Sequence, residues 1–155
     1  MKTLFTVLVF LIHCSAFAQR DKTLLSTQAA DDDSLKIKIT SINYVEGFYM
    51  NDAKRMASAI HAELTKRIIM KDDAGNMMIK NMGFSELLYN TKKNKNTNIK
   101  NPTAPFEAKV KIYEIYKAVA TAKVVTNKFK FIDYLHLAKI DGEWKIVNVL
   151  WEFAD

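Results

Sequence analysis

A two-residue turn, Asp141-Gly142, separates two long segments of alternating apolar and polar residues, and it constrains the fold more than any other feature. Asp-Gly is a strong signal for a tight β-hairpin, because both central residues of such a turn adopt positive φ. The pattern predicts strands over 129–140 and 143–153. A two-residue turn also fixes the register, so Ile140 is expected to face Glu143.

This register assigns the hairpin side chains to two faces. One face carries Asp133 among apolar neighbours, with Leu135 opposite Asn148 and Leu150 opposite Asp133 itself. The other face is expected to carry Tyr134, His136, Val147, Val149 and Trp151. Both faces are apolar, while helices cover only one of them, so either the sheet closes on itself or its second face meets another subunit. We favour the second alternative, a homodimer formed through the back of the sheet.

The N-terminus has the features of a secretory signal peptide. A positive charge at Lys2 precedes an apolar run over 4–12, and small residues at Ala16 and Ala18 favour cleavage before Gln19. The run is too short to span a membrane, which takes about 20 apolar residues. We therefore expect segment 1–18 to be removed from an exported product, periplasmic or secreted, with no membrane association afterwards.

A polar segment, 19–33, follows and is predicted to be a flexible leader to a single domain over 34–155. Its acidic end, Asp31-Asp32-Asp33, favours the start of a helix capped by Ser34 over a calcium site. Apolar residues then recur at helical spacing. The stripe consists of Leu35, Ile39, Ile42, Val45 and Tyr49, with Tyr44 and Phe48 in an adjacent row.

The remaining segments indicate an α+β domain with helices first and an antiparallel meander last. A second helix is expected from Ala53 to about His61, with Met56, Ile60 and Leu64 as its apolar face. Residues 66–70 and 76–80 predict a small hairpin, and 85–89 a third, short helix. From Phe106 onward the period is two, which indicates strands.

Composition excludes several classes of function. The net charge is +6, and +5 without Lys2, but only three of the basic residues are Arg, which disfavours nucleic-acid recognition. Signal cleavage would remove the only cysteine, Cys14, and leave two histidines without metal-ligand spacing, so no metal is expected. No Gly-rich phosphate loop or nucleophile motif occurs, and no cofactor is predicted.

Asp133 is the residue with the clearest chemical potential. A carboxylate among apolar side chains must find hydrogen bonds or take up a proton. It is therefore either a structural Asp bonded to a neighbouring Tyr or backbone amide, or a general base or ligand anchor in a pocket. His61, at the predicted end of the second helix, is a further polar candidate.

Two parts of the chain resemble a known family. Residues 43–49 with 51–53, and 133–137 with 141–148, are similar to the first helix and the closing hairpin of the putative lumazine-binding family, within the nuclear transport factor 2-like superfamily. The resemblance implies a cone-shaped, cystatin-like roll, in which three N-terminal helices pack on a strongly curved, mainly antiparallel sheet. It also implies frequent homodimers and an interior that hosts isomerase, cyclase or dehydratase chemistry in some members and only binding in others.

Three hypotheses follow. The first is an exported domain that binds a small apolar or aromatic ligand without catalysis, in a pocket lined by Tyr44, Phe48, His61, Asp133, Leu135 and Asn148. The second is a proton-transfer enzyme that uses Asp133 as its base, with Asn148 orienting it and Tyr44 or His61 polarising the substrate. The third is an interaction module whose interior is filled by its own side chains.

Overall fold

A computed structural model describes residues 28–96 and 99–154 of the chain. The chain divides into two compact units, Met1–Leu35 and Lys36–Asp155, and the two later helices and all the strands of the described residues belong to the second. The predicted signal segment 1–18 and residues 19–27 of the predicted leader lie outside the described residues. None of the helices that the structure describes is long and apolar enough to cross a membrane.

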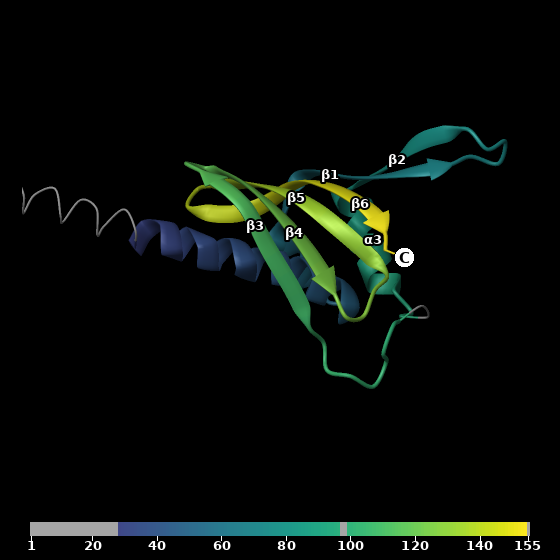
Figure 1. Ribbon diagram of the computed structural model, residues 1–155, viewed down its shortest axis with the longest axis horizontal. Helices are drawn as coiled ribbons and strands as arrows, with labels where there is room; N and C mark the ends of the chain where they lie inside the picture. Colours follow the sequence, from purple (N-terminus) through teal and green to yellow (C-terminus); the bar gives the residue numbers. More distant parts are fainter. Residues whose placement is uncertain (1–27, 97–98, 155) are drawn as a thin grey trace, which may run out of the picture. The chain divides into compact units, whose positions relative to one another are not determined.

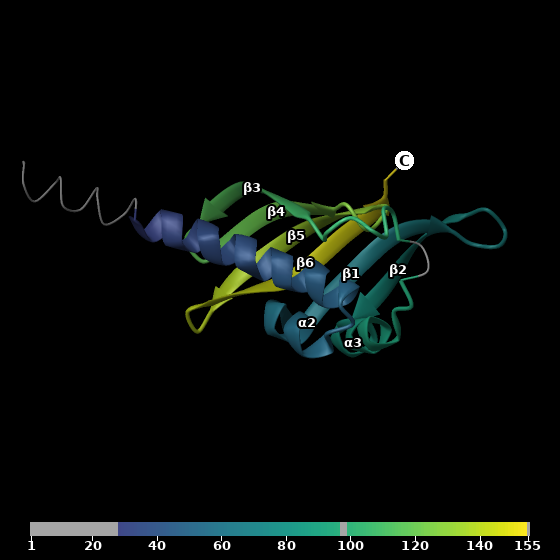
Figure 2. The ribbon, with the colours of Figure 1, turned by 90° about the horizontal axis from the view of Figure 1, so that it is seen from below.

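Two helices, a hairpin, a third helix and a closing antiparallel meander follow one another in the predicted order. Residues 28–49 are helical. The elements that follow are α2 (Ala53–Ala59), β1 (Ile60–Lys71), β2 (Met77–Gly83), α3 (Phe84–Lys93), β3 (Ala108–Tyr116), β4 (Val119–Thr126), β5 (Phe131–Ile140) and β6 (Glu143–Phe153). The six strands form one sheet in the order β2-β1-β6-β5-β4-β3. One face of this sheet is covered by residues 36–49 of the first helix, by α2 and by α3 (Figures 1 and 2).

The sheet is mixed, because β1 pairs with β6 in parallel while all the other neighbours are antiparallel. The register shifts within β1, β3 and β6, and such irregularities bend a sheet and increase its twist. The face toward the helices is called the inner face below, and the opposite one the outer face. The predicted α+β class with three helices on a curved sheet is confirmed for the described residues.

The closing hairpin begins in the predicted register and then leaves it. Ile140 pairs with Glu143, and Leu137 still pairs with Ile146, but His136 pairs with Asn148, so Val147 is an extra residue in β6. A one-residue bulge moves every later side chain of its strand to the opposite face. The predicted pairing was therefore wrong from Val147 onward.

Four side chains change faces as a result. Val149 and Trp151, predicted for the back of the sheet, lie on the inner face; Val149 pairs with Leu135 and is fully buried. Asn148 and Leu150, predicted to lie beside Asp133, are on the outer face with His136 and Tyr134. Asp133 itself is on the inner face, as predicted, and it pairs with Trp151.

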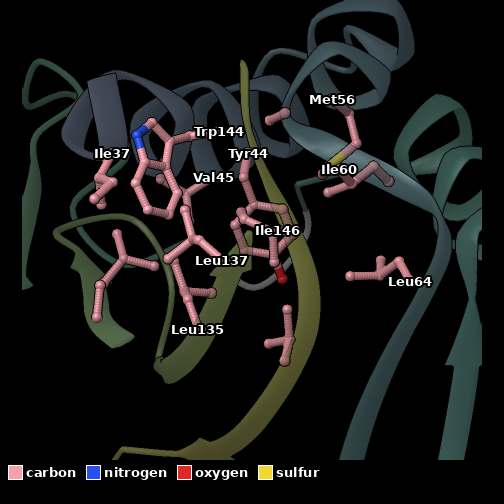
Figure 3. Packing of buried hydrophobic residues seen from close by; sticks show 14 of the residues in the cluster. Ile37, Tyr44, Val45, Met56, Ile60, Leu64, Leu135, Leu137, Trp144 and Ile146 are labelled. Atoms are coloured by element: carbon pink, nitrogen blue, oxygen red, sulfur yellow. The ribbon is translucent and has the colours of Figure 1, made fainter. Parts of the chain in front are cut away.

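The N-terminal helix also differs from the prediction. It already includes residues 28–33, so it does not begin at Ser34. Its buried side chains include Ile37, Ser41, Tyr44 and Val45, whereas Leu35 and Ile39 of the predicted stripe are about half exposed. The row that contains Tyr44 was predicted to lie beside the main apolar stripe, but it is this row that packs on the sheet. There Tyr44 lies among Leu135, Leu137 and Ile146 (Figure 3).

α2 is shorter than predicted. The Asp52 carboxylate accepts a hydrogen bond from the Arg55 amide at 2.9 Å and caps its start, but the helix ends at Ala59, and Ile60 and Leu64 belong to β1. α2 packs close to the first helix at Gly47, where a Cβ atom would lie 2.8 Å from the Met56 amide nitrogen. Glycine at position 47 therefore allows this approach.

Candidate functional site

The inner face holds a buried group of three polar side chains from three separate elements. The Lys66 ammonium of β1 lies 2.6 Å from Asp133 Oδ1 of β5 and donates to the Tyr44 hydroxyl oxygen at 2.6 Å. The Tyr44 hydroxyl in turn donates to Asp133 Oδ1 at 3.2 Å. Asp133 is 0% exposed and Lys66 7% exposed, so the ion pair is shielded from water. The structure thus favours the alternative in which a tyrosine hydroxyl binds Asp133.

Alternation along β1 places Lys66 in this group. Leu64 and Ile68 are buried, and Lys66 stands between them in the same phase, so its side chain also points to the inner face. A buried lysine needs partners that compensate for its lost hydration, and an opposite charge is one such partner. Asp133 supplies that charge, and its second oxygen, Oδ2, accepts no hydrogen bond from any described residue.

Aromatic rings surround the ammonium group. Lys66 Nζ is 4.8 Å from the ring centroid of Trp151, 5.3 Å from that of Tyr44 and 5.5 Å from that of Phe131. Cations interact favourably with ring faces at such distances. Burial, and then the Asp133 carboxylate, raise the pKa of Tyr44 well above its ordinary value of 10.0, so this hydroxyl stays protonated at neutral pH.

A cavity of about 270 Å³, called the inner cavity, lies beside this group. Its walls are formed by the first helix, α2, α3 and four strands. The lining residues are Tyr44, Val45, Phe48, Met56, Lys66, Met82, Leu87, Asn90, Phe131 and Trp151. Lys66 is the charged member of this lining. Within the described residues, the Asn90 amide nitrogen makes one long contact, to the Met82 sulfur at 3.6 Å, and so has capacity for a better partner.

A second, more open cavity of about 600 Å³, called the outer cavity, shares three of these aromatic residues. It is lined by Phe48, Asn94, Asn96, Phe129, Lys130, Phe131, Trp151 and Phe153. The Asn94 and Asn96 amides donate to the carbonyl oxygens of Phe48 and Tyr49, both at 2.9 Å, which fastens this loop to the end of the first helix.

The structure brings together only part of the predicted site. Tyr44 and Phe48 line the inner cavity. Asp133 does not line the cavity, but it is bonded to Lys66 and Tyr44, which do. Leu135 is a buried core residue beside Asp133.

The two other predicted residues lie elsewhere. Asn148 is on the outer face, where it contacts Arg67 and His136. His61 is part of β1, and its Nδ1 accepts from the Glu63 amide at 3.2 Å. Neither Asn148 nor His61 lines the inner cavity.

Sequence reasoning missed Lys66 and Trp151. Lys66 could have been noticed, because a lysine at the same alternate strand positions as Leu64 and Ile68 is unusual. The predicted second helix was too long and included Leu64 in its apolar face, so this strand alternation was not recognised. Trp151 was assigned to the other face because the bulge at Val147 has no signature in the alternation of β6.

The fold is shared with solved structures of low sequence identity. A protein of unknown function from Shewanella baltica, described as NTF2-like, aligns with a TM-score of 0.63 at 20% identity, over 80% of this chain and 95% of its own. A ketosteroid isomerase-like protein from Erwinia carotovora aligns with a TM-score of 0.54 at 11% identity, over 78% and 95% of the two chains.

A putative scytalone dehydratase from Novosphingobium aromaticivorans aligns with a TM-score of 0.57 at 11% identity, over 83% and 89% of the two chains. No curated protein shows a significant match to this sequence. The family model described as putative lumazine-binding matches residues 32–152. The match covers most of the chain and includes Tyr44, Lys66, Asp133 and Trp151; this protein therefore belongs to the putative lumazine-binding family and has an NTF2-like fold.

Proposed function

We propose that this protein binds a small molecule with a flat, largely apolar body in the inner cavity, and that Lys66 recognises an acceptor atom of that molecule. One observation carries the proposal: a cavity with apolar walls contains one lysine, held in place by a buried carboxylate and three aromatic rings. Apolar walls with a few convergent polar groups are typical of ligand sites.

The Lys66 ammonium has a donor to offer. An ammonium group carries three N–H donors, and two are used by Asp133 and Tyr44. Because Asp133 already balances the charge, the ligand atom at Lys66 does not need to be anionic; a ring carbonyl, ring nitrogen or phenolic oxygen would be sufficient. The family description makes lumazine a natural member of the probe panel.

The geometry favours binding over proton transfer by Asp133. The carboxylate is bonded to Lys66 and Tyr44 and is absent from the cavity lining, so these two side chains separate it from a bound molecule. We therefore assign Asp133 to the positioning of Lys66.

Tryptophan fluorescence tests the proposal directly. Trp151 lines the inner cavity, while Trp144 is a buried core residue outside the lining, so Trp144→Phe leaves a single reporter at the site. Titration with lumazine, riboflavin and 2-naphthol is expected to change the Trp151 emission saturably for at least one probe. A folded protein that responds to none of the three contradicts the proposal.

A matched pair of variants locates the binding. Val45→Phe adds bulk to the cavity wall and is expected to abolish the response, whereas Val119→Phe, the same change at a residue 55% exposed on β4, leaves it intact. Circular dichroism confirms that both variants fold. Binding to Val45→Phe with unchanged affinity would place the ligand elsewhere.

Removing Lys66 alone leaves a buried, unpaired carboxylate, so its contribution is measured in the double variant Lys66→Met/Asp133→Leu, which deletes both charges. Weaker binding by the folded double variant is expected, because the hydrogen bond to the ligand is lost. Undiminished affinity would assign recognition to other groups, such as the Asn90 amide.

We also propose that the protein is exported, on the strength of the N-terminal segment alone. Expression of the full chain in a Gram-negative host is expected to yield a periplasmic or secreted product whose N-terminal residue is Gln19. A cytoplasmic product that retains Met1 contradicts export.

A further inference from the structure

The inner cavity is small for a complete ligand. Its volume, about 270 Å³, is slightly below the roughly 300–1,000 Å³ of pockets that enclose whole small molecules. The adjoining outer cavity, of about 600 Å³, shares Phe48, Phe131 and Trp151 with it. A molecule whose ring body occupies the inner cavity therefore has room to continue past these three rings.

The shared rings belong to a continuous aromatic row. Phe129 and Phe131 are stacked with centroids 4.9 Å apart, Phe131 and Trp151 are 5.8 Å apart, and Trp151 and Phe153 are 5.2 Å apart. All four line the outer cavity, and two of them also line the inner one. The row offers apolar contact to a ligand chain along its path from one cavity to the other.

The charges of the two cavities differ. Lys66 in the inner cavity is neutralised by Asp133. Lys130 in the outer cavity is exposed, and no ion pair to it is formed among the described residues. Among the residues that the structure describes, neither lining contains Asp or Glu, so these linings offer an anionic group in the outer cavity a cation and no like charge.

We infer that the ligand is elongated and carries an anionic group, such as a carboxylate or a phosphate, at the end opposite its ring body, and that Lys130 binds this group in the outer cavity. The inference rests on the proposed function and names the class of ligand: a ring system with one acceptor for Lys66, an apolar connecting chain, and an anionic terminus.

Three probes test it on the Trp144→Phe protein: 2-naphthol, 2-naphthol with a six-carbon chain at ring position 6 that ends in a carboxylate, and the same compound with the chain ending in a methyl group. The chain is expected to increase affinity over that of 2-naphthol, because it contacts the aromatic row. The carboxylate is expected to bind about two- to fivefold more tightly than the methyl compound at low salt, the range of an exposed ion pair.

The variant Lys130→Met is expected to remove the advantage of the carboxylate and leave the affinity for the methyl compound unchanged. The matched control is Lys54→Met, which removes an exposed lysine of α2 outside both linings and should leave the advantage intact. In the parent protein, 0.5 M salt should reduce the advantage, because screening weakens exposed charge pairs.

The outcomes separate the two proposals. If 2-naphthol binds but the chain adds nothing, or if Lys130→Met leaves the preference for the carboxylate unchanged, the elongated anionic ligand is overturned and the inner cavity stays a ligand site. If none of the three probes changes the Trp151 emission, the ring-binding site itself fails, and the inference fails with it.

Discussion

Among single residues, Tyr44 couples the buried polar group to pH. Its pKa is raised above 10 by burial and by Asp133, so the folded state holds this proton more tightly than the unfolded chain. The stability that this proton confers is present in full below the unfolded pKa of about 10 and is lost as pH rises through the higher folded value.

The free energy of unfolding should therefore fall between pH 10 and 11 by up to about 1.4 kcal/mol per pH unit more steeply in the parent protein than in Tyr44→Phe. Urea unfolding at pH 9, 10 and 11 measures the two slopes. Tyr134→Phe, at a tyrosine that is 45% exposed, is the control and should behave like the parent. Equal slopes in all three proteins would contradict the coupling.

A second residue, Lys128, is fully buried yet lies outside the candidate site. Its ammonium donates to the carbonyl oxygens of Asn101, Pro102 and Ala104, so it uses all three donors to fix this loop. Lys128→Met should cost about 2–4 kcal/mol of unfolding free energy, because the carbonyls lose a charged donor. Lys130→Met, two residues away and exposed, should change stability by less than about 0.5 kcal/mol in the same urea titration. A similar small effect at Lys128 would show that water replaces the ammonium.

At the scale of elements, the closing hairpin shows what a sequence pattern can and cannot determine. The turn, both strands and the first four residue pairs follow from Asp141-Gly142, because a two-residue turn has few geometries. The bulge at Val147 could not be predicted, since apolar residues occupy both faces of β6 and alternation does not reveal the inserted residue. Because of this one inserted residue, Val149 and Trp151 lie on the inner face in the places predicted for Asn148 and Leu150. The candidate site therefore contains Trp151 and not Asn148.

The edge strand β2 has a different property. The β1–β2 hairpin protrudes beyond the other strands (Figures 1 and 2), and Met77, Met78 and Ile79 on it are 43–65% exposed. Exposed apolar edge strands promote association between sheets. Ile79→Lys should therefore slow aggregation at elevated temperature, measured by light scattering, with a change in stability below about 0.5 kcal/mol. Aggregation at the parental rate would show that this edge is not where the chains meet.

For the molecule as a whole, the fold was far more predictable than the site. Periodicity, one turn and a family resemblance together yield the order of helices and strands, since each signal is local in the chain. The candidate site combines Tyr44, Lys66, Asp133 and Trp151, which lie up to 107 positions apart and meet only because β1 inserts in parallel beside β6. No local sequence pattern predicts this parallel pairing of β1 with β6, and the position of Lys66 in the site depends on it.

The predicted homodimer remains a prediction at this scale, with a corrected surface. Val149 and Trp151 are inner-face residues, so the exposed apolar side chains at the centre of the outer face are Tyr134 and Leu150, which are 45% and 46% exposed and pair across β5 and β6. If two sheets associate back to back, Leu150→Glu places a carboxylate in the contact and should convert the dimer to a monomer.

Sedimentation velocity at micromolar and higher concentrations measures the change, and Ile79→Lys, far from the outer-face centre on strand β2, serves as the variant that should stay dimeric. The unfolding free energy of the monomeric variant at high dilution should match that of the parent, because Leu150 is exposed in the single chain. A parent protein that is monomeric at every concentration would rule out the back-to-back dimer and leave Tyr134 and Leu150 exposed to solvent.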